Sequence, residues 1–116
     1  MRNFRELIIW NDAIQLVKKV YSLNGLLPQS EKYGLSSQIC RAAVSIPSNI
    51  AEGCSRNSQK EFKHFLEITL GSAFELEPQL LIISELEMIK ENGITELLED
   101  LHKLQAQINS LINKIK

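Results

Sequence analysis

Two glutamate–histidine pairs have the spacing of metal ligands in a helical protein. Glu61 precedes His64 by three residues, and Glu99 precedes His102 by three residues. Di-iron proteins built from four helices use two such pairs and two further glutamates, all pointing into the core. On a helical wheel, however, both pairs lie away from the apolar positions of their own segments. The spacing raises a metal-dependent bundle enzyme as a hypothesis, and the side-chain directions favour solvated helix surfaces instead.

Nucleophilic chemistry has less support in this sequence. Neither Cys40 nor Cys54 has a histidine nearby, and no Gly-x-Ser-x-Gly motif or glycine-rich phosphate loop is present. If one helix joins the two cysteines, about 1.5 Å per residue places them roughly 21 Å apart, which is too far for a disulfide. We therefore predict two buried, reduced thiols in a cytoplasmic protein, with no catalytic residue, metal site or cofactor.

A polar stripe between residues 38 and 56 is more informative. Its members recur at helical spacing opposite Ile39, Ile46 and Ile50. They are Gln38, Arg41, Ser45, Ser48, Asn49, Glu52 and Arg56. One interpretation is a solvated surface with weak ion pairs. The other is an interface, because small serines and fixed hydrogen bonds let another helix approach closely. We predict an interface or structural role for five of them, which are Arg41, Ser45, Asn49, Glu52 and Arg56.

Charge is balanced overall and uneven along the chain. Thirteen basic and fourteen acidic residues give a net charge of −1, which excludes a strongly basic, autonomous nucleic-acid binder. Residues 1–56 hold seven basic and four acidic side chains, whereas residues 57–116 hold six and ten. Complementary halves in an oligomer would use this asymmetry, and so would a basic surface for nucleic acid. The candidate residues for that surface are Lys18, Lys19, Arg41 and Arg56.

Four amphipathic segments must position these side chains. A chain of 116 residues with 44% hydrophobic residues and few glycines and prolines predicts one helical domain over residues 1–116. The segments cover about 4–23, 30–54, 58–90 and 94–115. Short connectors favour antiparallel neighbours, so the predicted fold is an all-α, up-down four-helix bundle. Pro47 and Pro78 lie inside segments, and we predict a kink in the helix at each.

The first segment carries more apolar surface than one partner helix can bury. One stripe is Leu7, Trp10, Ile14, Val17 and Tyr21, and the stripe beside it is Ile9, Ala13, Leu16, Val20 and Leu23. Together they cover about half of the helix surface at 100° per residue. The pattern predicts that one stripe faces the core and the other a second surface, such as another subunit.

The polar stripe also belongs to a longer distinctive run. The run is Arg41, Ala42, Ala43, Ser45, Ile46, Pro47, Ser48, Asn49, Ile50, Ala51, Glu52, Gly53 and Arg56. It resembles the signature of the bacterial 23S rRNA-intervening sequence proteins. Further ordered matches between Leu7 and Leu80 extend the resemblance over nearly the whole chain, and Pro78 departs from the usual pattern.

The resemblance implies an antiparallel four-helix bundle that assembles as a ring, typically a pentamer, without established catalytic activity. Some relatives are encoded within insertions in large-subunit ribosomal RNA genes. A similar protein is the RNA-binding accessory subunit of a reverse transcriptase in diversity-generating retroelements.

We therefore predict a non-enzymatic, homo-oligomeric scaffold, a pentamer, that binds RNA or a nucleoprotein partner through a charged surface or channel. The alternative is a protein-binding adaptor or assembly subunit without nucleic-acid contact. Apolar runs such as residues 80–83 fall far short of the ~20 residues that cross a bilayer, so no membrane contact is predicted. Without a catalytic motif, we also predict no small-molecule substrate.

Overall fold

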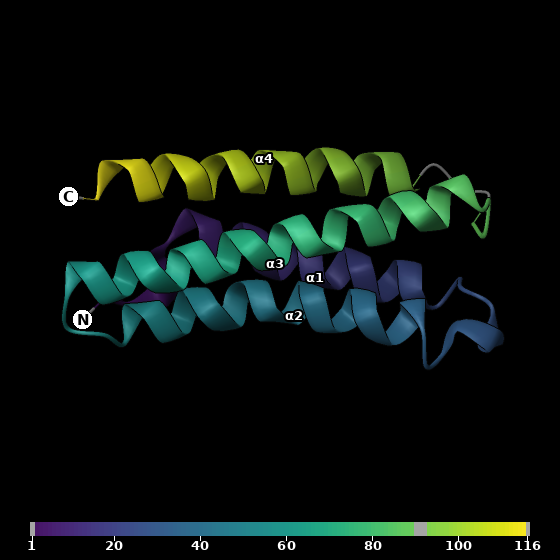
Figure 1. Ribbon diagram of the computed structural model, residues 1–116, viewed down its shortest axis with the longest axis horizontal. Helices are drawn as coiled ribbons and strands as arrows, with labels where there is room; N and C mark the ends of the chain where they lie inside the picture. The colour runs from purple at the N-terminus through teal and green to yellow at the C-terminus, as the bar shows by residue number, and fades with distance from the viewer. Residues whose placement is uncertain (1, 90–92, 116) are drawn as a thin grey trace.

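The computed structural model describes residues 2–89 and 93–115, and the described part folds into four α-helices without a strand (Figure 1). The helices are α1 (Ile8–Asn24), α2 (Leu35–Cys54), α3 (Gln59–Glu85) and α4 (Gly93–Lys114), and two 3₁₀ turns, η1 (Phe4–Glu6) and η2 (Gln29–Glu31), precede α1 and α2. This architecture confirms the all-α four-helix bundle. None of the described helices is long and apolar enough to span a membrane.

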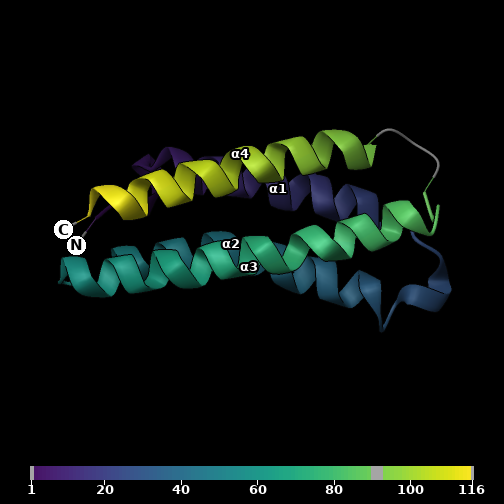
Figure 2. The same cartoon turned by 45° about the horizontal axis from the view of Figure 1, so that its top comes forward.

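The helices pack in the order α1, α2, α3, α4 around the bundle axis. Each one contacts the next, and α4 closes the circle on α1. The bundle measures 44 × 23 × 20 Å, and the chain direction reverses from each helix to the next (Figures 1 and 2). The outer surface between α1 and α2 therefore lies on the opposite side of the bundle from the surface between α3 and α4. We call these surfaces the α1/α2 face and the α3/α4 face.

The core is built from one apolar stripe of each helix. In α1 it is the stripe that begins at Ile9, whereas the stripe that begins at Leu7 remains partly exposed. The sequence predicts this division. In α4 the core includes Gln105 beside leucines and isoleucines, and Leu111 is only half-buried.

Three helix ends differ from the predicted ones. The first helix begins at Ile8 rather than Phe4, because Leu7 is extended (φ −80°, ψ 131°) and separates it from the turn η1. The second begins at Leu35 rather than Ser30, because Gly34 leaves the helical region (φ −107°, ψ −111°). The third ends at Glu85 rather than near Lys90, which lies outside the described residues. Glu87 follows that end with a φ of +51°, which an α-helix does not accommodate.

Both internal prolines lie within continuous helices. Pro47 is buried in α2, and Pro78 is exposed in α3 without splitting it. The third segment is therefore a single helix, as predicted, and the kink at each proline stays a prediction.

The α2–α3 connection brings these two helices close together. Ser58 caps α3, because its hydroxyl oxygen accepts from the backbone N–H of Glu61 at 3.1 Å. Near the end of α2, a Cβ on Gly53 would lie 2.8 Å from the Cβ of Phe65, a separation that real side chains do not tolerate. Glycine at this position therefore permits the close approach of α2 to α3.

Candidate functional site

Part of the predicted polar stripe lies between α2 and α3. The hydroxyl oxygens of Ser45 and Ser72 are 2.7 Å apart and share a hydrogen bond. The amide of Asn49 donates to the backbone oxygen of Ser45 at 2.8 Å and to its hydroxyl oxygen at 2.9 Å. Since these groups are half-buried, the Ser45–Ser72 bond contributes to holding α2 against α3, and Asn49, whose two bonds lie within α2, positions the Ser45 hydroxyl.

The charged members of the stripe lie nearer to solvent. Arg56 pairs with Glu52 at 3.5 Å, one helical turn away, and its guanidinium lies 4.9 Å from the centre of the Phe65 ring. An exposed pair of this kind contributes little to stability, so stacking on the ring does more to position Arg56. Arg41 is exposed, and within residues 2–89 and 93–115 no ion pair includes it.

The four candidate residues for nucleic-acid contact do not gather on one surface. Lys19 of α1 pairs with Glu96 of α4 at 3.1 Å and with Asp100. Its hydrogen bond to Asp100, followed by that to Glu96, raises the pKa of Lys19 above the ordinary value of 10.5. Lys18 is exposed on α1, whereas Arg41 and Arg56 lie on α2 and just after it. The Lys19 charge is thus already balanced within the bundle.

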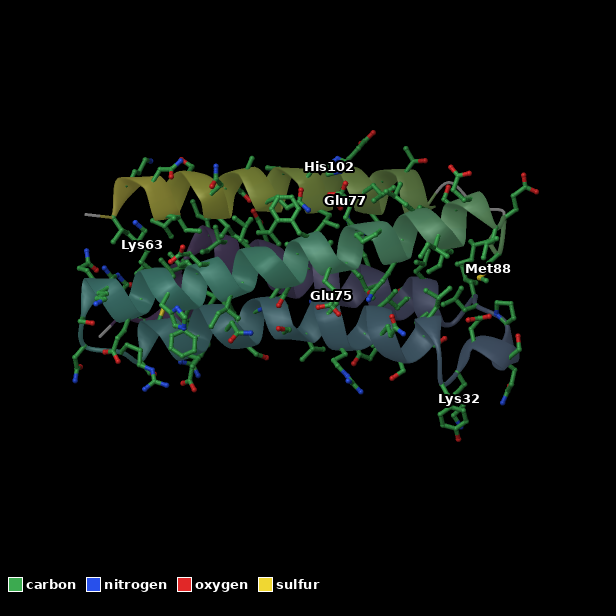
Figure 3. The ribbon with its side chains drawn as sticks, viewed as in Figure 1. Lys32, Lys63, Glu75, Glu77, Met88 and His102 are labelled. Atoms are coloured by element: carbon green, nitrogen blue, oxygen red, sulfur yellow. The ribbon has the colours of Figure 1, made fainter. Side chains whose placement is uncertain are left out.

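The two glutamate–histidine pairs point outward, as predicted. Glu61, His64, Glu99 and His102 are all exposed, and in the part of the chain that the structure describes no group of three or more metal-ligating side chains could hold an ion. His102 instead lies 3.4 Å from a carboxylate oxygen of Glu77 on α3 (Figure 3).

Both cysteines carry free thiols. Cys54 is buried as predicted, and Cys40 is only half-buried. Burial raises the pKa of each thiol above its ordinary value, so both are less nucleophilic than an exposed cysteine.

A buried glutamine joins α3 to α4, and the sequence did not reveal it. The Gln105 amide donates to a carboxylate oxygen of Glu77 at 2.9 Å and to the backbone oxygen of Ala73 at 3.3 Å. The hydrogen bond from Gln105 to the Glu77 carboxylate is the main reason why the pKa of Glu77 lies below its usual range. The available signal was position alone, because Gln105 follows Leu101 by four residues on the core side of α4.

An apolar groove crosses the α1/α2 face. It has a volume of about 310 Å³. Its lining is Phe4, Trp10, Ile14 and Val17 from the N-terminal part and Val44, Pro47, Ser48 and Ala51 from α2, and we call it the α1/α2 groove. The indole of Trp10 packs against the Phe4 ring, with centroids 4.9 Å apart. The second apolar stripe of α1 thus forms one wall of an open groove.

An apolar ridge runs along α3 on the opposite side of the bundle. We call it the α3 ridge, and its members are Leu70, Phe74, Pro78 and Leu81. Phe74 is 55% exposed and Leu81 is 43% exposed. Glu77, three residues after Phe74 and four before Leu81, contacts α4, which places the ridge toward the α3/α4 face. The prediction assigned only one apolar side to this helix and missed the ridge.

Comparison with known proteins supports this fold. No curated protein matches the chain. A crystal structure of a protein of unknown function from the S23 ribosomal protein family of Bacteroides thetaiotaomicron has the same fold, with a TM-score of 0.83 and 24% sequence identity over 90% of this chain and 98% of that chain. The family model described as 23S rRNA-intervening sequence protein matches residues 5–110. The chain therefore belongs to the 23S rRNA-intervening sequence protein family.

Proposed function

We propose that the protein is a non-enzymatic, homo-oligomeric helical scaffold, and that the oligomer is a pentamer. The observation that carries this proposal is that exposed apolar surface lies on several sides of one small bundle, at the α1/α2 groove, at the α3 ridge and around Ile8 between α1 and α4. Contiguous exposed apolar surface mostly marks places where another macromolecule binds. The pentamer itself is what the family resemblance implies.

Neither the family description nor that of the structural relative includes a catalytic activity. The first refers to an intervening sequence of 23S rRNA, and the second to a protein of unknown function. A structural role for this chain agrees with both descriptions.

Sedimentation equilibrium at several micromolar concentrations tests the scaffold proposal. We expect a mass of five times the 13.2 kDa subunit that persists on dilution into the low micromolar range. A species of 13.2 kDa throughout that range would overturn the proposal. Assemblies of another size would leave the scaffold in place and refute the pentamer.

Binding of RNA phosphates is a second candidate function, favoured by the charge at one end of the bundle. The basic residues at the end where α2 meets α3 are Arg2, Arg5, Arg56, Lys60, Lys63 and Lys114. Three acidic residues, Glu6, Glu52 and Glu61, accompany them. Lys63 is visible there beside the last turns of α4 (Figure 3). We call this surface the basic end. Of the residues predicted to contact nucleic acid, it includes only Arg56.

Two arginines of the basic end lie against aromatic rings. The Arg2 guanidinium is 4.0 Å from the Phe62 ring centre, and that of Arg56 is 4.9 Å from the Phe65 ring centre. Stacking fixes the planar groups while leaving N–H donors at their edges, an arrangement suited to phosphate oxygens. In a ring whose bundles run parallel, the basic ends of all copies would add their charge at one rim.

A salt titration with a structured RNA tests this second function. We expect the affinity of the wild type to fall steeply as salt increases, because cations are released from the RNA. Lys60→Glu combined with Lys63→Glu is expected to weaken binding at least tenfold at low salt, whereas Lys32→Glu, at the other end of the bundle, leaves it unchanged. An absence of binding at low salt would instead support the protein-binding adaptor. Equal losses in both variants would refute the basic end as the site.

A further inference from the structure

We infer that the two sides of α1 form the contact between copies of this chain, so that Ile8 of one copy is seated in the α1/α2 groove of the next. This inference rests on the proposed homo-oligomer and adds which surfaces meet. The occupant of the groove is a second copy of the same chain, and the contact joins two unlike surfaces.

A second apolar groove lies between α1 and α4. It has a volume of about 610 Å³, and its apolar lining includes Leu7, Ile8, Ala106 and Leu111. We call it the α1/α4 groove. The Ile8 side chain in its lining is 70% exposed. Exposed apolar surface therefore lies on both sides of α1.

The two grooves lie on neighbouring sides of the bundle and at the same level along it. Because α1 contacts both α2 and α4, it separates one groove from the other. Phe4 and Trp10 line the α1/α2 groove, and Leu7 and Ile8 line the α1/α4 groove, so both grooves flank the N-terminal part of α1. The last turns of α4 lie at this same end of the bundle (Figure 2).

This placement allows a ring to close. In a ring of five parallel bundles, the two contact surfaces of each copy face about 108° apart and lie at one level. Neighbouring sides of a four-helix bundle face roughly 90° apart, which is close to that angle. A two-fold dimer pairs one patch with itself and would leave the other groove exposed. Copies of the chain in a ring cover both grooves, whereas a foreign partner bound on one side would cover only one.

Shape is complementary across this contact. The Ile8 side chain projects from one copy, and the α1/α2 groove of the next copy is concave, with a volume of about 310 Å³. Since a cavity of about 150 Å³ already accepts benzene, the groove has room for an isoleucine side chain and part of a neighbouring one. Ser48, which lines the α1/α2 groove and is exposed on α2, is small enough to let the helices of the two copies approach closely.

Charged side chains at the edges of the two grooves have opposite signs. Lys103 and Lys114 line the α1/α4 groove, together with Glu6. Glu52 directly follows the last α2 residue that lines the α1/α2 groove, and its side chain is 51% exposed although it pairs with Arg56. A lysine of one copy can therefore pair with Glu52 of the next at the edge of the contact. Pairs at such an edge select the partner and the register more than they add affinity.

Substitutions in the two surfaces test this contact. Ile8→Glu places a carboxylate on the projecting side, and Val44→Glu places one in the groove, where Val44 is 40% exposed. We expect each variant to sediment at 13.2 kDa with wild-type helix content by circular dichroism. Phe74→Glu is the matched control, because Phe74 is 55% exposed on α3 and lies outside both grooves. This variant should assemble like the wild type.

Cross-linking identifies which surfaces meet. Ile8→Cys and Ser48→Cys are introduced into separate chains, which are produced together in one cell and treated with a short bismaleimide. We expect a covalent species of twice 13.2 kDa when both chains are present, and none when either variant is produced alone. The wild type treated in the same way measures the background from Cys40, which is half-buried, and Cys54, which is buried.

Several outcomes would show that this contact is wrong while the scaffold proposal stands. They are normal assembly of Ile8→Glu or Val44→Glu, dissociation of Phe74→Glu, and cross-linking that is as strong in either cysteine variant alone as in the two together. A monomeric wild type would instead remove the proposed function itself.

Discussion

Gly53 is the position where the space between α2 and α3 is smallest. An alanine Cβ there would lie 2.8 Å from the Phe65 Cβ and 3.3 Å from a Phe62 ring carbon. Because Phe62 is buried and the Phe65 Cβ is fixed to its backbone, the helices must separate to admit the methyl group. We expect Gly53→Ala to lower the free energy of unfolding by about 1–3 kcal/mol, measured by urea denaturation at a fixed protein concentration.

Gly71→Ala provides the comparison for that measurement. Gly71 lies within α3, and an added Cβ would meet no atom within 4 Å. Alanine is the better helix former, so this variant should be as stable as the wild type or have a free energy of unfolding higher by about 0.5–1 kcal/mol. If the two substitutions changed the free energy of unfolding equally, the close contact at Gly53 would not be what restricts this position to glycine.

Residue types alone could not predict the hydrogen-bond partners in the candidate site. Ser45 and Asn49 stand out in the sequence, but Ser72, which bonds Ser45, lies 27 residues away and is identified only once the register of α2 on α3 is known. The same holds for Lys19, whose two acidic partners belong to the last helix. The spacing of residues along one helix shows which of them share a side of that helix. It does not show which residues of the neighbouring helix they contact.

Helices α3 and α4 are joined by a carboxylate with a shifted pKa. Glu77 accepts a hydrogen bond from Gln105 and lies 3.4 Å from His102, and its pKa is lower than the ordinary 4.5. A lowered native pKa means that the ionised form is favoured by folding, so this contribution is present above pH 4.5 and is lost as pH falls through the native pKa. We expect Glu77→Gln to be less stable than the wild type by about 1 kcal/mol at neutral pH, with the difference shrinking below pH 4.5.

Urea denaturation over a pH series measures that difference. Glu75→Gln, at an exposed position of α3 that neither Gln105 nor His102 contacts, removes the same charge and should change stability little at any pH. A wild-type advantage over Glu77→Gln that stays constant down to pH 2 would contradict the assignment to the Glu77 carboxylate.

The number and type of helices could be predicted from periodicity, whereas their ends depend on local backbone geometry. Leu7 and Gly34 have torsion angles that end helical turns, although Leu7 carries no capping signal that a pattern would detect. The α3 ridge could not be predicted by the same method. A search for one apolar side finds the stripe through Leu76 and Leu80, and only the packed bundle reveals that Phe74 and Leu81 lie outside it.

Positive and negative side chains are distributed unevenly over the folded molecule. A net charge of −1 becomes a basic half and an acidic half because α1 and α2 are neighbours and α3 and α4 are neighbours. The balance of acidic and basic side chains also differs between the two ends of the bundle. Around the C-terminal ends of α1 and α3 the described acidic residues outnumber the basic ones. They are Glu31, Glu85, Glu87, Glu96, Glu99 and Asp100 against Lys18, Lys19 and Lys32. A chain with a net charge near zero can therefore form an assembly with separate regions of positive and negative charge.

The exposed apolar surfaces also affect a single subunit before it assembles. A lone bundle leaves the α1/α2 groove and the Phe74 ring in contact with water. Apolar surface of this kind promotes non-specific association as well as specific binding. Subunits produced without their partners would therefore aggregate, whereas subunits produced together at high local concentration would meet one another first.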